Sequence, residues 1–99
     1  MNVITPTIGR IVWFWENVET RDLEHAQPEA AVVTYVHSDR CVNLTVFDHN
    51  GFPRSVTSVE LRQPGDQTFP QGFFCEWMPY QIGQARKHTA ESDGDCGSA

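Results

Sequence analysis

The chain has 99 residues, of which 39% are hydrophobic and 11% aromatic, and its formal net charge is −6. This length predicts one domain with one modest core, and no stretch approaches the roughly 20 apolar residues of a membrane span. The six arginines and one lysine form no basic stripe, which argues against binding to a DNA or RNA polymer.

The three cysteines include no CxxC pair, and the first residues lack the charged and apolar regions of a signal peptide. We therefore expect a soluble protein with free thiols in a reducing cytoplasm. This compartment makes the Asn43-Leu44-Thr45 glycosylation sequon irrelevant.

The first half of the chain predicts three strands. Residues 8–15 follow the pattern of β-branched and aromatic side chains that is typical of a strand. Residues 16–29 are polar and acidic and predict a long loop, of the kind that is often functional. Residues 30–37 and 41–48 predict two strands, which the short polar turn between them joins as a hairpin.

The second half predicts two more strands after the Asn50-Gly51 turn signal. Residues 55–62 form the fourth strand, and its apolar residues break strict alternation once. A β-bulge near Thr57-Ser58 accounts for that break. After a loop rich in proline and glycine, residues 73–78 form the fifth strand, which Pro79 ends.

Residues 81–88 predict a single helical turn, and the small polar residues 89–99 predict a disordered tail. Five short strands with almost no helix predict an all-β fold, a small five-stranded antiparallel barrel of the Src-homology-3-like kind. We expect residues 1–83 to form this barrel domain and residues 84–99 to form the helical turn and the tail.

Trp13, Phe14 and Trp15 place three rings in a row, although neighbouring side chains of a strand point to opposite faces. If Val12 and Phe14 face inward, both tryptophans point outward, whereas the opposite phase buries both tryptophans and exposes Phe14. A ring outside the core is either covered, by residues 16–29 or by another subunit, or offers a stacking platform to a flat ligand.

A second aromatic cluster, Trp77 and Tyr80, closes the predicted domain and either seals a barrel end or lines a groove beside the first cluster. The turn that contains His37 and Arg40 is either an ordinary polar turn or an anion site. The predicted ligand-binding residues are Trp13, Trp15, His37, Arg40, Arg54, Trp77 and Tyr80.

The sequence predicts no metal site, no cofactor and no enzymatic activity. The four histidines are not spaced as ligand pairs, and no nucleophile stands beside a base in a recognisable arrangement.

Four stretches carry a resemblance to a known family: Gly9-Arg10-Ile11-Val12, residues 28–33 (Pro-Glu-Ala-Ala-Val-Val), residues 42–46 (Val-Asn-Leu-Thr-Val) and Glu76-Trp77-Met78-Pro79. Over residues 8–80 the chain resembles a family of small uncharacterised proteins from tailed bacteriophages and prophages. The resemblance implies a phage protein in the cytoplasm of a host cell, and short non-enzymatic phage proteins often disarm host defence by binding something.

Two functions follow as expectations. The first is an anti-defence sponge, a homo-oligomer that sequesters a small nucleotide signal, with bases stacked on the aromatic rings and phosphates held by Arg40 and Arg54. The second is an acidic inhibitor that binds a host defence protein through residues 16–29, whose carboxylates include Glu16, Glu19, Asp22 and Glu24. A virion accessory or structural subunit is a further alternative.

Overall fold

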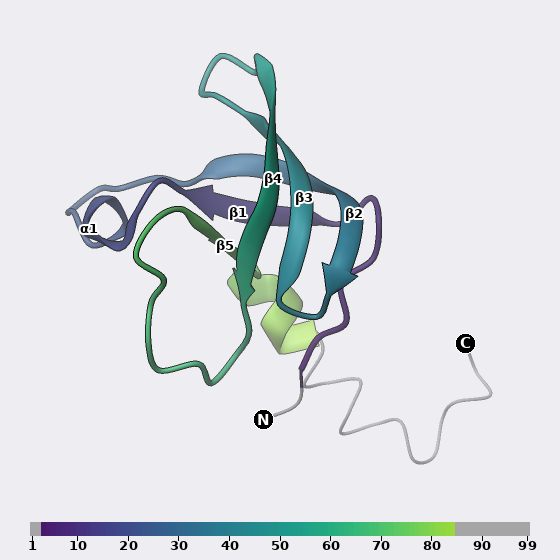
Figure 1. The fold of residues 1–99 in the computed structure, drawn as a ribbon. Helices are drawn as coiled ribbons and strands as arrows, with labels where there is room; N and C mark the ends of the chain where they lie inside the picture. Colours follow the sequence, from purple (N-terminus) through teal and green to yellow (C-terminus); the bar gives the residue numbers. More distant parts are fainter. Residues whose placement is uncertain (1–2, 85–99) are drawn as a thin grey trace.

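Five strands close into a barrel in chain order in the computed structural model, which describes residues 3–84 (Figure 1). The strands are β1 (Ile11–Trp15), β2 (Glu29–Ser38), β3 (Cys41–Phe47), β4 (Pro53–Arg62) and β5 (Phe74–Glu76). The five-stranded barrel predicted from the sequence is confirmed. The predicted tail and residues 85–88 of the predicted helical turn lie outside the described residues.

Four of the strand pairings are antiparallel, and the pairing of β4 with β5 is parallel. One parallel pair is required because strand directions can alternate around a closed ring only if the number of strands is even. A parallel connection must return to the end where the previous strand began. The segment between Arg62 and Phe74 makes that return along the outside of the barrel (Figure 1).

Val12 and Phe14 face the barrel interior, which decides between the two phases that the sequence left open, and the neighbouring tryptophans lie on the outer face. Val42, Leu44 and Val46 of β3 point to the same core, as their alternation predicts. The core consists of Val12, Phe14, Ala31, Val33, Val42, Leu44, Val46, Val59, Leu61, Cys75 and Trp77.

The predicted bulge in β4 is confirmed. Val42 pairs with Val59 and Leu44 pairs with Val56, so that two β4 residues, Thr57 and Ser58, stand opposite a single residue of β3. Ser58 adopts a positive φ of 55°, and its N–H donates to the side-chain Oδ1 of Asn43 at 2.8 Å. The extra residue shifts the alternation, so β4 presents inward side chains both before and after the bulge.

Residues 16–29 do not form an uninterrupted loop, so that prediction is wrong in one part. They contain α1 (Val18–Arg21), a helix of four residues at the end of β1 (Figure 1). The side chain of Asn17 caps this helix by accepting a hydrogen bond from the N–H of Thr20 at 2.7 Å. A helix of one turn buries little surface, so its sequence does not show the repeating apolar positions that predict a longer helix.

A second helical segment follows β5 and begins at Pro79, two residues before the predicted turn. Proline suits the first helical position because it needs no hydrogen-bond partner for an N–H there. The side chain of Gln81 accepts a hydrogen bond from the N–H of Met78 and donates one to the carbonyl of Ile11, both at 2.8 Å. These two bonds hold the segment against the start of β1.

The segment lies at the end of the barrel that we call the closed end, where Gln63 and Trp77 fill the interior. Gln63 is 2% exposed, and all of its side-chain hydrogen bonds are made within the chain. Its Oε1 accepts from the N–H of Ile4 and from the indole of Trp77, and its Nε2 donates to the carbonyls of Ile4 and Asp39. A buried amide with no unsatisfied group seals this end.

Candidate functional site

The predicted tryptophans of β1 have different surroundings. Trp13 is half-buried on the outer face, where it pairs with Ala30 and Glu76. Trp15 is 6% exposed, and its indole N–H donates to Oε2 of Glu76 at 2.7 Å. The sequence left open whether the ring of Trp15 is covered or offers a stacking platform, and in the structure the ring is covered.

The second aromatic cluster is divided between the interior and the surface. Trp77 is 2% exposed and belongs to the core at the closed end, with its indole N–H 3.3 Å from Oε1 of Gln63. Tyr80 is 73% exposed on the helical segment that follows β5. The two rings therefore offer no common stacking face.

His37 and Arg40 lie near the closed end, at the β2–β3 turn. The Nε2 of His37 is 3.0 Å from Oδ1 of Asn43, and its exposed ring packs edge-on against Tyr35. Arg40 forms an ion pair with Asp66. The hydrogen bond between these two side chains raises the pKa of Arg40 and lowers that of Asp66.

Arg54 lies at the opposite end of the barrel, which we call the open end. The structure therefore does not bring the seven predicted residues together, because Arg40 and Trp77 are at the closed end, whereas Trp15 and Arg54 are at the open end. Their role in ligand binding stays a prediction.

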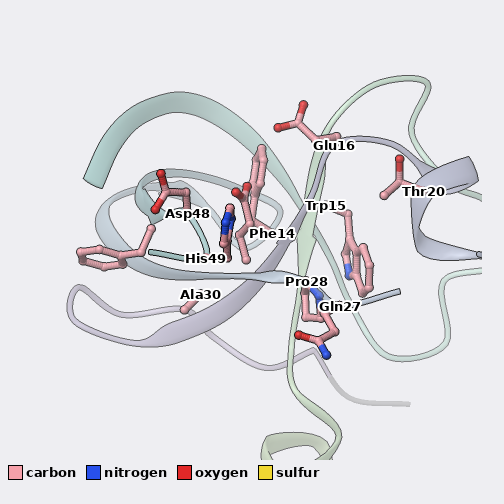
Figure 2. Close-up of a pocket in the computed structure, with 11 residues that line it drawn as sticks. Phe14, Trp15, Glu16, Thr20, Gln27, Pro28, Ala30, Asp48 and His49 are labelled. Atoms are coloured by element: carbon pink, nitrogen blue, oxygen red, sulfur yellow. The ribbon is translucent and has the colours of Figure 1, made fainter. Parts of the chain in front are cut away.

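A pocket of about 530 Å³ opens beside the ends of β1 and β3 and the start of β2 (Figure 2). Its volume lies within the range of small-ligand sites, roughly 300–1,000 Å³. The pocket combines aromatic and apolar side chains with carboxylates and amides. It is lined by Phe14, Trp15, Glu16, Thr20, Gln27, Pro28, Glu29, Ala30, Phe47, Asp48 and His49.

Negative charge predominates around this pocket. Glu16, Glu29 and Asp48 line it, and Arg54 beside it is already paired with two of them. Arg54 Nη2 donates to Glu29 at 2.8 Å and to Glu16 at 3.1 Å. The hydrogen bond to Glu29 is the main cause of the raised pKa of Arg54. Three carboxylates against one guanidinium leave the open end with excess negative charge.

Phe14 forms an aromatic floor next to these charges. The guanidinium carbon of Arg54 lies 5.6 Å from the centre of the Phe14 ring, within the distance of a cation–π contact. Phe73 packs against the same ring with 5.8 Å between ring centres, and it is 43% exposed. Phe14 itself is 2% exposed and is covered by these two side chains, so the groups that the open end offers to a cationic ligand are its carboxylates.

Asp48 is held in place by the β3–β4 turn. Its Oδ1 accepts hydrogen bonds from the backbone N–H groups of Asn50 and Phe52, both at 2.9 Å. The bond from Phe52 is the main cause of the lowered pKa of Asp48. Gly51 supplies the positive φ, 85°, that the predicted Asn-Gly turn requires. The carboxylate is therefore ionised at neutral pH and fixed at the rim of the pocket.

A cluster on the outer face holds the covering segments over Trp15. Glu76, whose side chain is 13% exposed, accepts hydrogen bonds from Trp15 and from Nε of Arg21, the latter at 2.9 Å, and lies 3.8 Å from Arg62. The guanidiniums of both arginines stack on Phe69, with the carbon of Arg62 3.8 Å from the ring centre. This satisfied cluster positions one wall of the pocket.

Sequence reasoning did not single out Glu29, Asp48 or Phe14 as members of a site. A signal was present, because Glu29 and Arg54 occupy inward positions of their strands, where the pattern is otherwise apolar. A charged side chain at an inward position near the end of a strand indicates that this end of the barrel is open to solvent. No sequence pattern links Glu16 with Arg54, since 38 positions separate them.

Within residues 3–84, no group of three or more His, Cys, Asp and Glu side chains is arranged to hold a metal ion. Burial raises the pKa of the Cys75 thiol, so this core side chain is not a ready nucleophile. In the same part of the chain, no helix has the length and apolar character needed to cross a membrane.

No family model, no curated protein and no solved structure matches this chain. The resemblance to bacteriophage proteins therefore stays an expectation, and the function is argued from the open end itself.

Proposed function

We propose that this chain is a non-enzymatic binding protein that holds a basic side chain of a protein partner at the open end of its barrel. The observation that carries this proposal is that three carboxylates, those of Glu16, Glu29 and Asp48, line one pocket. Carboxylates attract a cationic group and accept its hydrogen bonds.

The contacts of Arg54 support a guanidinium as the bound group. Its side chain, 39% exposed, already combines two carboxylates with the face of Phe14. A partner's arginine would meet carboxylates at Asp48 and at Glu16, whose side chain is 62% exposed. The charged groups at the rim would also steer a basic partner towards the pocket.

The region around α1 extends the negative surface beyond the pocket. Glu19, Asp22 and Glu24 are exposed there, and the side chain of Glu24 is 88% exposed. This arrangement favours the second sequence-based expectation, in which the acidic segment binds a basic protein surface. A host defence protein as the target is what the bacteriophage resemblance adds to the proposal.

The nucleotide sponge stays a prediction with less support. The two arginines that it assigns to phosphates lie at opposite ends of the barrel, and each is paired with carboxylates. A nucleotide phosphate at the pocket would face the three carboxylates and would be repelled by them.

The test is calorimetric titration of the full chain with two probes, a short arginine-containing peptide and a cyclic dinucleotide. We expect the peptide to bind and its affinity to fall about tenfold in the Glu16→Gln/Asp48→Asn variant, because both substitutions keep a hydrogen-bond acceptor and remove the charge.

The matched control is Asp39→Asn/Glu60→Gln, which removes two charges from exposed positions near the closed end. Equal losses in the two variants would show that net charge, rather than the pocket, attracts the peptide. Binding of the dinucleotide that weakens in Arg54→Met would replace the proposal with the sponge.

A further inference from the structure

The outer face of β1, β2 and β3 carries a strip without a charged side chain. Ile11, Val32 and Thr45 lie side by side across the three strands in one row, and Trp13, Ala30 and Phe47 lie side by side in the next. Side chains that pair directly across strands share a face of the sheet. We call these six residues the outer strip.

The strip is accessible along its length. Ile11 is 40% exposed, Ala30 is exposed, and the other members are half-buried. Polar positions usually alternate with the core positions on the outer face of a small barrel, so an apolar row there needs a reason. Apolar patches of this kind on a soluble domain usually mark a contact surface.

The outer strip is continuous with the pocket. Ala30 and Phe47 belong to the strip and also line the pocket. In β2, Glu29 pairs with the inward Phe14, while the next residue, Ala30, points outward beside Trp13. One step along the strand, about 3.3 Å, therefore separates the acidic mouth from the apolar strip.

We infer that the outer strip and the open end form one docking surface for a protein segment in which an apolar side chain lies one or two residues from an arginine. This inference rests on the proposed function and adds the chemistry of the partner. The apolar side chain packs on Trp13 and Val32, and the arginine reaches the carboxylates at the mouth.

Charge favours such a partner over a second copy of this chain. Two copies would bring together two bodies of net charge −6, each with carboxylates beside the strip, whereas a basic segment is attracted to the same place. The expected occupant is therefore a different protein with basic and apolar residues side by side.

The experiment compares three short peptides in calorimetric titrations of the full chain. One holds a single arginine among glycine and serine, the second adds a leucine on each side of the arginine, and the third keeps the leucines but replaces the arginine with glutamine. We expect the second peptide to bind about tenfold more tightly than the first, since an apolar side chain becomes buried.

The variant Ile11→Thr/Val32→Thr keeps β-branched side chains and is expected to remove that gain. Leu23→Thr is the matched control, because Leu23 is 65% exposed and lies away from the strip. Ala30→Lys provides a second variant at an exposed position, where the new charge repels the arginine peptide. Thermal melts establish that each variant is folded.

Equal affinities for the first two peptides would overturn this inference and leave the proposed function standing. Equal affinities for the second and third peptides would overturn the proposed function, and the inference with it. Light scattering adds a last test: a dimer of the full chain that Ile11→Thr/Val32→Thr dissociates would assign the strip to a second copy and overturn the inference.

Discussion

The two ends of the barrel handle inward-facing polar groups in opposite ways. At the closed end, the neutral amide of Gln63 is buried, and every one of its hydrogen bonds ends on the backbone or on Trp77. At the open end, Glu29 and Arg54 are charged and partly exposed, and they pair with each other across the mouth.

This difference assigns folding stability to the closed end of the barrel and ligand binding to the open end. A buried neutral group whose hydrogen bonds are all satisfied stabilises a single arrangement of the core. Its removal leaves its former partners buried, with no hydrogen bond to protein or to water. Charged groups in contact with solvent exchange partners at small cost, because water screens both the pair and the separated ions. We therefore expect substitutions to act on folding at the closed end and on affinity at the open end.

The largest effect is expected for Gln63→Leu. The indole N–H of Trp77 and the backbone groups of Ile4 and Asp39 lose their partners, which should lower the free energy of unfolding by about 3 kcal/mol. Urea denaturation of the full chain measures this change. The control is Gln67→Leu at an exposed position, and a similar loss there would contradict the role assigned to Gln63 at the closed end.

A smaller loss is expected for Glu76→Gln, which tests whether the wall over Trp15 depends on a charge. The substitution weakens the hydrogen bonds to Arg21 and leaves two arginines near each other, so the free energy of unfolding should fall by about 1–2 kcal/mol. Denaturation followed by the fluorescence of the three tryptophans measures this change. A change no larger than that of the exposed Glu60→Gln would show that packing alone holds the wall.

At the open end, Arg54→Met should change the free energy of unfolding by less than about 1 kcal/mol, because the ion pairs of Arg54 are solvent-screened. The same variant makes the mouth more negative and should bind the arginine peptide more tightly. A loss of stability as large as that of Gln63→Leu would remove the distinction between the two ends.

The smallest effects are expected from acid titration of the two aspartates with lowered pKa values. Asp66 contributes stability above its unfolded pKa of about 3.9, because the ionised form is hydrogen-bonded by Arg40, and this contribution is lost as the pH falls through the lowered pKa of the folded state. The stability difference between the native chain and Asp66→Asn should therefore disappear in acid.

Asp48→Asn at the open end provides the comparison, since the Phe52 N–H lowers the pKa of Asp48 in the same direction. Urea midpoints measured from neutral pH down to acid test both sites. A stability difference that grows as the pH falls would contradict the expected direction at either aspartate.

The strands and the barrel were predictable because alternation is a local property of the chain, although alternation alone left both phases of β1 open. The bulge was predictable for the same reason, since Val56, Val59 and Leu61 cannot share a face without an extra residue. The parallel pairing of β4 with β5 follows only once closure of an odd number of strands is considered.

The composition of the pocket was not predictable from local patterns. Glu16, Glu29 and Arg54 meet only because the barrel brings the end of β1 beside the starts of β2 and β4. The sequence left Trp77 open between sealing a barrel end and lining a groove, and in the structure its ring completes the core. Both the composition of the pocket and the burial of Trp77 are set by contacts between segments that lie far apart in the sequence.

The bulge at Thr57 and Ser58 sets a constraint on how the length of this chain can vary. Removing one of the two would restore one-to-one pairing with β3 and strict alternation, so that Val59, Leu61 and Gln63 would keep their inward positions. Removing Glu60 instead would turn Leu61 and Gln63 outward, because every later side chain of β4 would change face. The bulge is therefore the place where β4 can change its length by one residue without exposing the core.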